Sequence, residues 1–412
     1  MRVKLIFLTI FIITGCTKFT ENLNGDFIDY KEAKVSDFNT EFPVINIEVN
    51  QDEFDKMYTN FNEDIEIEGN LNVYRKNEQI IFNELVEIEI KGSFSASLDL
   101  KSLGIKFDKT FKEEGVLLNP EKVLPNHSLK EIKAFRLRNS GNDFTKTLLK
   151  DISYTQLAIN AGLNLDLTYF EPSIVFVNSK FLGIMNLRSE ANTNGISRLR
   201  DAKKKDITLA KINNPAELEK KDGDFDRIDA FIVAIEEQNL EYLKAEIDID
   251  NFIDYIIFQS YIANVDWPYN NVRFYAVKDG PFRFVVYDLD WVNLRETDHH
   301  PLEFIRKPTR LSSNKVIKNP ITDLFNVLYS DENFKTKFNQ RYLEIINTKL
   351  LYFEEFNRIV DVNFSTIEQY MPTHLQKYTD IKTMIDWYRN IELLKANFRK
   401  REKHIFSMDK NF

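Results

Sequence analysis

The sequence predicts an α+β protein with two lobes, a small β-rich lobe over residues 43–190 and a larger helix-rich lobe over residues 191–412. Apolar and polar residues alternate in several runs of the first third, which is typical of half-buried strands. In the second half apolar residues recur at steps of three and four, which is typical of amphipathic helices. One strand-turn-strand stretch, residues 272–287, interrupts those helices. We expect a ligand in the cleft between the lobes, where ligands commonly bind.

The β-rich lobe begins at "FPVINIEV", where Ile45, Ile47 and Val49 fall on one face. "LVEIEIKG" and "LGIKFDK" repeat the alternation, so we expect an antiparallel sheet with one helix added. That helix is "NDFTKTLLKDISYTQLAINAGL", whose apolar residues follow a helical period up to a stop at Gly162. "SIVFVNSKFLGIMNL" then predicts two strands around the turn "NSK".

The helix-rich lobe is predicted from segments with helical spacing: "IDAFIVAIEEQNLEYLKAEI", "NFIDYIIFQSYIA", "ITDLFNVLY", "ENFKTKFNQRYLEIINTKLL" and "YFEEFNRIVDVNFSTIEQYM". The second of these ends near Asn264, because Pro268 cannot continue a helix and disfavours a helical residue before it. Asp266 is therefore expected on a loop.

The N-terminus "MRVKLIFLTIFIITGC" has a basic start and a short apolar run. That run is shorter than the roughly 20 residues that span a bilayer, so residues 1–15 predict a secretory signal. "ITGC" resembles the bacterial lipobox, which implies lipidation of Cys16 and an anchor in the cell envelope, periplasmic or surface-exposed. Residues 16–42 then form a polar tether. The alternative is an ordinary signal peptide with a chance cysteine.

Composition excludes several classes of protein. Cys16 is the only cysteine, so the chain can form no intramolecular disulfide and no cysteine-ligated metal site. A net charge of −9 counts against a nucleic-acid partner. The 34 phenylalanines indicate a folded core rather than a disordered surface protein.

Polar residues gather at the open end of the strand-turn-strand stretch. Asp279-Gly280 is a strong hairpin turn signal, and as the two turn residues they place Asn271 opposite Asp288. The register could differ by one, because Pro281 is an awkward partner in a ladder. Asp266 lies on the loop that feeds the same end.

Carboxylates held close together repel unless a cation neutralises them, and Mg²⁺ favours one or two carboxylates with phosphate oxygens. The remaining acid is then available to take a substrate proton. Asp266 and Asn271 have the spacing Asp-x-x-x-x-Asn, and a further acid follows in Asp288. This is the order of the catalytic loop and metal-binding aspartate of protein kinases. The plainer interpretation is that these residues, with Asp290, only cap turns at strand ends.

Several ordered blocks resemble the spore-coat protein H (CotH) kinase family of atypical secreted protein kinases. They are "IKGSFSASLDLKSLGIKF", "FRLRNSGNDFTKTLLKDISYTQLAINAGL", "FVNSKFLGIMNLRSE", "NVDWPYNN" and "FVVYDLDW". The resemblance covers most of residues 43–350. It implies a two-lobed kinase-like fold that uses ATP with Mg²⁺ or Mn²⁺.

The resemblance also implies roles for individual residues. Asp266 matches the acid that accepts the proton of the substrate hydroxyl. Asn271 and Asp288 match metal ligands, and Asp290 is a neighbour able to share that role.

The nucleotide-binding residues are less closely defined by the resemblance. Either Lys101 or Lys106 matches the phosphate-contacting lysine. The remaining matches are the phosphate-covering loop and the junction of the lobes: Gly92, Ser93, Ser95 and Glu190. "KGSFS" departs from the family pattern, since Lys91 replaces arginine and Phe94 replaces a small polar residue. Phe94 either crowds the phosphates or faces the core.

These observations predict a lipid-anchored, exported, monomeric kinase that transfers the γ-phosphoryl group of ATP to a hydroxyl, expected to be serine or threonine of a protein. The first alternative is a non-catalytic, kinase-like surface protein that binds a partner. Phe94 and the scarcity of ATP outside the cytoplasm favour that alternative. The second is a metal-dependent phosphohydrolase that uses the same acids.

Overall fold

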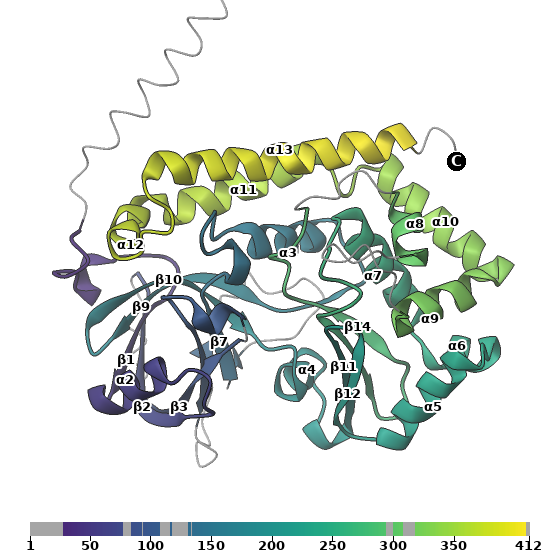
Figure 1. The fold of residues 1–412 in the computed structure, drawn as a ribbon, viewed down its shortest axis with the longest axis horizontal. Coiled ribbons are helices and arrows are strands. Elements are labelled where there is room, and N and C mark those ends of the chain that lie inside the picture. The colour runs from purple at the N-terminus through teal and green to yellow at the C-terminus, as the bar shows by residue number, and fades with distance from the viewer. Residues whose placement is uncertain are drawn as a thin grey trace, which may run out of the picture.

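The computed structural model describes residues 28–76, 84–92, 94–107, 116–117, 131–132, 134–293, 300–307 and 318–408. The signal sequence, Cys16, Ser93 and the beginning of the tether lie outside these residues. The fold is α+β, with a closed barrel, a second sheet beside it and helices along one side of both (Figure 1). In the described part of the chain, no helix combines the length and hydrophobicity needed to cross a membrane.

The barrel contains most of the strands expected in the first part of the chain. Its strands neighbour one another in the order β1-β2-β3-β4-β7-β10-β9. Their bounds are β1 Val44–Val49, β2 Glu66–Tyr74, β3 Glu84–Lys91, β4 Ser102–Phe107, β7 Ala134–Arg138, β9 Phe170–Val177 and β10 Lys180–Ser189. Neighbours are antiparallel except β1 and β9, whose parallel pairing closes the barrel. A separate two-stranded sheet joins β5 (Val116–Leu117) to β6 (Glu131–Ile132).

The second sheet belongs mainly to the C-terminal half. Its order is β12-β11-β13-β14-β8, with bounds β8 Asp166–Leu167, β11 Ile207–Asn213, β12 Glu217–Asp222, β13 Val272–Val277 and β14 Arg283–Val286. The hairpin β13–β14 is the predicted strand-turn-strand stretch. The sequence did not predict β11 and β12, and β8 joins this sheet from residues that precede β9 and β10.

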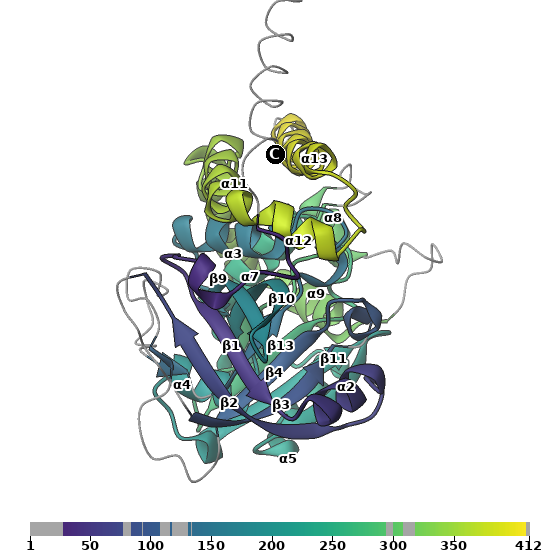
Figure 2. The same cartoon turned by 90° about the vertical axis from the view of Figure 1, so that its left-hand side faces the viewer.

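In the described residues, the helices of the C-terminal half include all five predicted segments, the first of which divides into two helices, and four further helices that the sequence did not predict. Their bounds are α4 Thr193–Leu199, α5 Phe225–Glu236, α6 Leu240–Glu246, α7 Ile249–Tyr261, α8 Pro301–Arg306, α9 Pro320–Tyr329, α10 Glu332–Asn347, α11 Phe353–Ile367, α12 Met371–Lys377 and α13 Met384–Met408. The N-terminal half holds α2 (Gln51–Thr59) and α3 (Lys150–Asn160). Figures 1 and 2 show α11 and α13 lying side by side along the outer edge, over α3.

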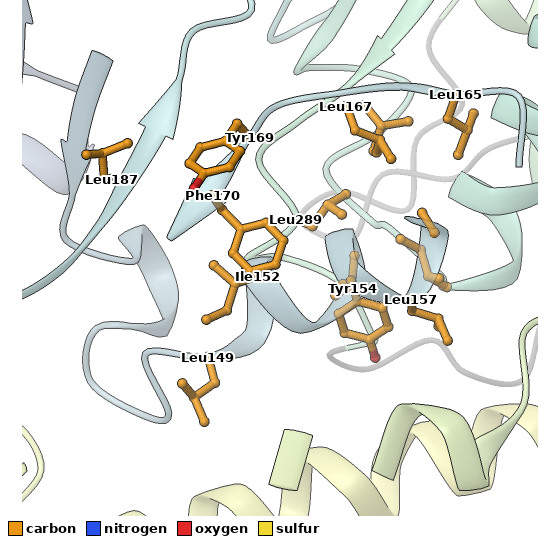
Figure 3. Packing of buried hydrophobic residues seen from close by; sticks show 14 of the residues in the cluster. Leu149, Ile152, Tyr154, Leu157, Leu165, Leu167, Tyr169, Phe170, Leu187 and Leu289 are labelled. Carbon is orange, nitrogen blue, oxygen red and sulfur yellow. The ribbon is translucent and has the colours of Figure 1, made fainter. Parts of the chain in front are cut away.

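One continuous hydrophobic cluster joins the barrel to the helices. Helix α3 lies near its centre, and Figure 3 shows side chains gathered around it from β10, the β8–β9 region and the segment after β14. Leu149 and Ile152 of this region are fully buried, and so is Leu289, which follows β14. The core therefore ties α3 directly to the chain segment that carries Asp288 and Asp290.

Candidate active site

A cavity of about 320 Å³ lies between the barrel and the second sheet. Its wall comes from both sheets and from the segment after β10. The lining residues are Lys91, Arg136, Arg138, Asp151, Thr168, Arg188, Ser189, Glu190, Ala191, Asn192, Leu209, Lys221, Asp222, Arg273, Tyr287 and Asp288. Basic side chains outnumber acidic ones on this wall, so an anionic ligand suits it.

Two of the arginines on the wall are held in an environment that disfavours their own charge. Arg188 is only 4% exposed. Burial lowers the pKa of both Arg188 and Arg136, because the charged guanidinium loses water. A bound anion would favour the charged forms again, and guanidinium groups match the geometry of phosphate oxygens.

Asp288 and Asp290 share one cation. Arg138 Nη2 donates to Asp288 Oδ1, and it also donates to Asp290 Oδ2 at 2.9 Å. Burial raises the pKa of Asp288, but the charges of Arg138 and Arg136 outweigh burial and hold that pKa below its usual value. Burial, and then the charge of Asp288, raises the pKa of Asp290 well above its usual value. A second cation at this pair would therefore be strongly favoured.

The segment "RNSGND" brings backbone close to Asp290. The amide N–H of Asn142 donates to Asp290 Oδ2 at 2.8 Å. Gly141 has a φ of +57°, and a Cβ at this position would lie 2.0 Å from Asp290 Oδ2. Only glycine permits both the left-handed backbone and this close approach. Gly141 thus allows the backbone of this segment to approach the Asp290 carboxylate closely.

Asp266 lies on the loop between α7 and β13, as the sequence predicts. Its Oδ2 accepts from the side-chain Nδ2 of Asn271 at 2.6 Å and of Asn270 at 2.8 Å. Two carboxamides therefore fix the orientation of this half-buried carboxylate. Since Nδ2 of Asn271 faces Asp266, its Oδ1 is the atom left for a metal ion.

The predicted hairpin register is wrong by one residue. Arg273 pairs with Val285 and Phe274 with Phe284, so continuing the ladder puts Asn271 opposite Tyr287 rather than Asp288. The physical reason lies in the turn, where Pro281 has no N–H for a ladder bond and Gly280 N–H instead donates to Val277 O. Asn271 and Asp288 still flank the open end of the hairpin, Asn271 directly before β13 and Asp288 two residues after β14.

The two predicted lysines are engaged away from the cavity wall. Lys101 is buried, and its Nζ donates to the carbonyls of Ala96 and Leu98 at 2.7 and 2.9 Å. Lys106 Nζ pairs with Glu66 at 2.7 Å and Glu89 at 2.9 Å. Two other lysines do line the cavity, Lys221 and Lys91, and Lys91 is the residue that departs from the family pattern.

Of the other predicted nucleotide-binding residues that the structure describes, one lines the cavity and two do not. Glu190 lines the cavity, 3.9 Å from Arg136. Gly92 and Ser95 are not among its lining residues, and Ser95 O accepts from Asn139 Nδ2 at 3.1 Å. Phe94 is 61% exposed and also does not line the cavity. The expectation that Phe94 faces the core is therefore wrong.

Sequence reasoning missed the arginines that surround the site and the buried Asp151. Arg136 and Arg138 alternate along β7 in "FRLRN", and Arg188 lies two residues before Glu190. Charged residues at alternate positions of an otherwise apolar strand are the available signal, because they must face either solvent or a polar cavity.

The donor set around the hairpin end suits a hard divalent cation. Asp288 and Asp290 are carboxylates that one arginine holds together and cannot fully neutralise. Among the described residues, no group of three or more His, Cys, Asp or Glu forms a ready metal site. The arrangement therefore fits an ion that takes its remaining ligands from water or phosphate oxygens, as Mg²⁺ does.

Comparison with known proteins identifies the family. Residues 88–405 match the family model of the CotH kinase protein, which covers more than half of the chain. The chain belongs to the CotH kinase family. The blocks that carry Arg138, Asp266 and Asp288 all fall within the matched range. No curated protein matches the chain.

Among solved structures, this chain is similar to a chain of the Shewanella oneidensis MR-1 toxin–antitoxin complex of HipA, HipB and operator DNA. The identity is 12% and the TM-score is 0.27. The match covers 66% of this chain and 58% of that chain. A likeness of this degree says nothing about function.

Proposed function

We propose that the protein is an exported, ATP-dependent phosphotransferase whose nucleotide occupies the cavity between the barrel and the second sheet. In this proposal the barrel, within residues 43–190, and the second sheet with its helices, within residues 191–412, are the two lobes of a kinase-like fold. The observation that carries the proposal is the cavity wall, which combines a cluster of buried and partly buried arginines with Asp288. Membership of the CotH kinase family supports the same chemistry.

The wall offers different surfaces to the two ends of a nucleotide. Ala191 and Leu209 are buried apolar residues suited to contact a base. Arg136, Arg188 and Lys91 supply the cations that the phosphates require. The phosphate contacts therefore come from arginines on strands β7 and β10 and from the last residue of β3.

Asp266 is the group that accepts the proton of the attacking hydroxyl. Asn270 and Asn271 hold its carboxylate in place, which keeps the accepting oxygen oriented before the substrate arrives. Asn271, Asp288 and Asp290 would hold Mg²⁺ or Mn²⁺. Such an ion, when bound, neutralises charge on the transferring phosphates. Catalysis then depends on positioning and on electrostatic stabilisation.

The proposed acceptor is a serine or threonine hydroxyl of a protein. Lipidation at Cys16 would attach the enzyme to a bacterial membrane in the cell envelope, as a monomer on the polar tether. Lys101 and Lys106 remain sequence-based candidates for phosphate contact, but their observed partners favour a structural role.

The test uses the purified exported chain with γ-labelled ATP and Mn²⁺. Asp266→Asn and Asp288→Asn should each abolish phosphoryl transfer, because the first loses the proton acceptor and the second a metal ligand. Asp279→Asn is the matched control, since it removes an exposed acid at the far end of the same hairpin. Full activity in the Asp288 variant would overturn the assignment.

A thermal-shift titration separates catalysis from simple binding of a partner. A nucleotide at about 100 times its Kd adds about 2.7 kcal/mol of stability. We expect MgATP or MnATP to raise the melting temperature of the wild-type protein. No shift at millimolar nucleotide would favour the non-catalytic alternative.

A further inference from the structure

Asp151 is a buried acid in the first turn of α3, behind the acid pair. It is 5% exposed. Its Oδ1 accepts the backbone N–H of Leu289 at 3.1 Å, and Leu289 is the residue between Asp288 and Asp290. One side chain thus holds the backbone from which both acids project.

The helix that carries Asp151 is firmly fixed. Its start is held by Asp143, whose Oδ2 accepts the N–H of Lys150 at 3.0 Å. Ile152, the next residue, is 1% exposed within the central hydrophobic cluster, together with Leu289 (Figure 3). A side chain on a rigid, packed helix can hold a functional segment more accurately than a loop residue can. Asp151 therefore connects the core to the acid pair.

Asp151 also lies between two arginines. Its Oδ2 is 3.2 Å from Arg188 Nη1 and 3.6 Å from Arg138 Nε. On its other side, Arg138 reaches Asp288 and Asp290. The charges alternate from Arg188 through Asp151 and Arg138 to the acid pair, so the carboxylate of Asp151 attracts Arg138 away from the place where a divalent cation would bind.

We propose that Asp151 is a positioning residue for Asp288 and Asp290. Through Leu289 it sets the backbone position of both acids, and through Arg138 it limits how far a guanidinium competes with a divalent cation for them. The consequence for phosphoryl transfer rests on the proposed function. The positioning of the Asp288–Asp290 segment by Asp151 does not depend on the proposed function, because it concerns the metal-free protein.

Two substitutions separate the two contacts. Asp151→Ala removes both the acceptor for Leu289 and the negative charge. Asp151→Asn keeps a carbonyl oxygen that can accept the Leu289 N–H, and it loses only the charge that faces the arginines. Asp254→Asn is the matched control, because Asp254 is also a buried helix acid that accepts a backbone N–H, from Asn164, and pairs with an arginine, Arg341.

The first readout is amide hydrogen exchange of residues 287–292 in the metal-free protein. We expect exchange at Leu289 to be at least tenfold faster in Asp151→Ala, close to wild type in Asp151→Asn, and unchanged in Asp254→Asn. Unchanged exchange in a folded Asp151→Ala variant would overturn the proposal.

The second readout is Mn²⁺ affinity by titration calorimetry, with no nucleotide present. Partners of metal-binding residues typically contribute 10–100-fold to metal affinity. We expect a loss of about tenfold or more in Asp151→Asn, because Arg138 then turns fully to the acids, and no loss in Asp254→Asn. Wild-type affinity in Asp151→Asn would contradict the proposed restraint on Arg138. If wild type itself binds no Mn²⁺, the proposed function fails, whereas hydrogen exchange still decides whether Asp151 holds the segment.

Discussion

Replacing Arg138 by glutamine removes the cation that Asp288 and Asp290 share. The shared nitrogen lies 2.9 Å from Asp290 Oδ2 and contacts Asp288 at the same time. At an effective dielectric constant of 20, a charge pair at this distance is worth about 6 kcal/mol before the cost of burial. Breaking a buried pair by removing one partner typically costs roughly 3–5 kcal/mol. Asp290 can take up a proton in the variant, so we expect a loss of about 3 kcal/mol at neutral pH.

The assay is thermal unfolding in EDTA and in Mn²⁺. In EDTA the Arg138→Gln variant should melt roughly 5 °C below wild type. Because Mn²⁺ replaces the lost cation, it should raise the melting temperature of the variant more than that of wild type. Arg341→Gln is the control, since it breaks the pair with Asp254 away from the acids, and Mn²⁺ should not restore its stability. Equal melting temperatures in EDTA, or equal Mn²⁺ shifts in Arg138→Gln and wild type, would refute the reasoning.

Further predictions concern the buried histidine and the two lysines. Burial, and then the charge of Lys377, lowers the pKa of His374 from 6.5 to about 3. His374 therefore takes up a proton mainly on unfolding. For this reason the free energy of unfolding is unaffected by protonation of His374 above pH 6.5, and it falls by up to about 1.4 kcal/mol per pH unit as the pH drops from 6.5 toward 3. His374→Asn retains an acceptor for the N–H of Ile184 and should flatten this slope in urea unfolding at pH 7 and pH 4.5, whereas an unaltered slope would assign the acid sensitivity to other groups. Lys101→Met should cost about 2–3 kcal/mol by leaving buried carbonyls unpaired, and Lys106→Met less than about 1 kcal/mol, with the KM for ATP unchanged in both. Arg188→Met should raise the KM for ATP about tenfold or more. A larger rise in KM in Lys101→Met or Lys106→Met than in Arg188→Met would instead indicate that the strand lysine contacts the phosphates.

Local patterns predicted the elements whose apolar period is clear. Residues 272–277 and the helix that ends at Tyr261 were found because β-branched and aromatic residues, proline and the Asp-Gly turn act within a few positions. β12 was missed because its residues are polar and mostly exposed, so it shows no alternation. α2 was missed because only Phe54 and Met57 of its nine residues are buried.

Closure of the barrel depends on pairs that are distant in sequence. Ile45 pairs in parallel with Val175, and no local pattern specifies that partner. For the same reason the sequence placed Asp266 and Asp288 near one hairpin end but did not place Arg138 between the acids. The sequence also could not show that Lys101 and Lys106 lie off the cavity wall, because a strand pattern shows which residues alternate and does not show which face borders a cavity.

The most direct test of the account is a crystal structure with a non-hydrolysable ATP analogue and Mn²⁺, in which anomalous scattering locates the metal. We predict that the analogue lies in the cavity between the barrel and the second sheet, with its phosphates on Arg136 and Arg188. We also predict that Mn²⁺ is bound by Asp288 and lies in reach of Asn271. Nucleotide outside this cavity, or an anomalous peak away from Asp288, would contradict the proposed function.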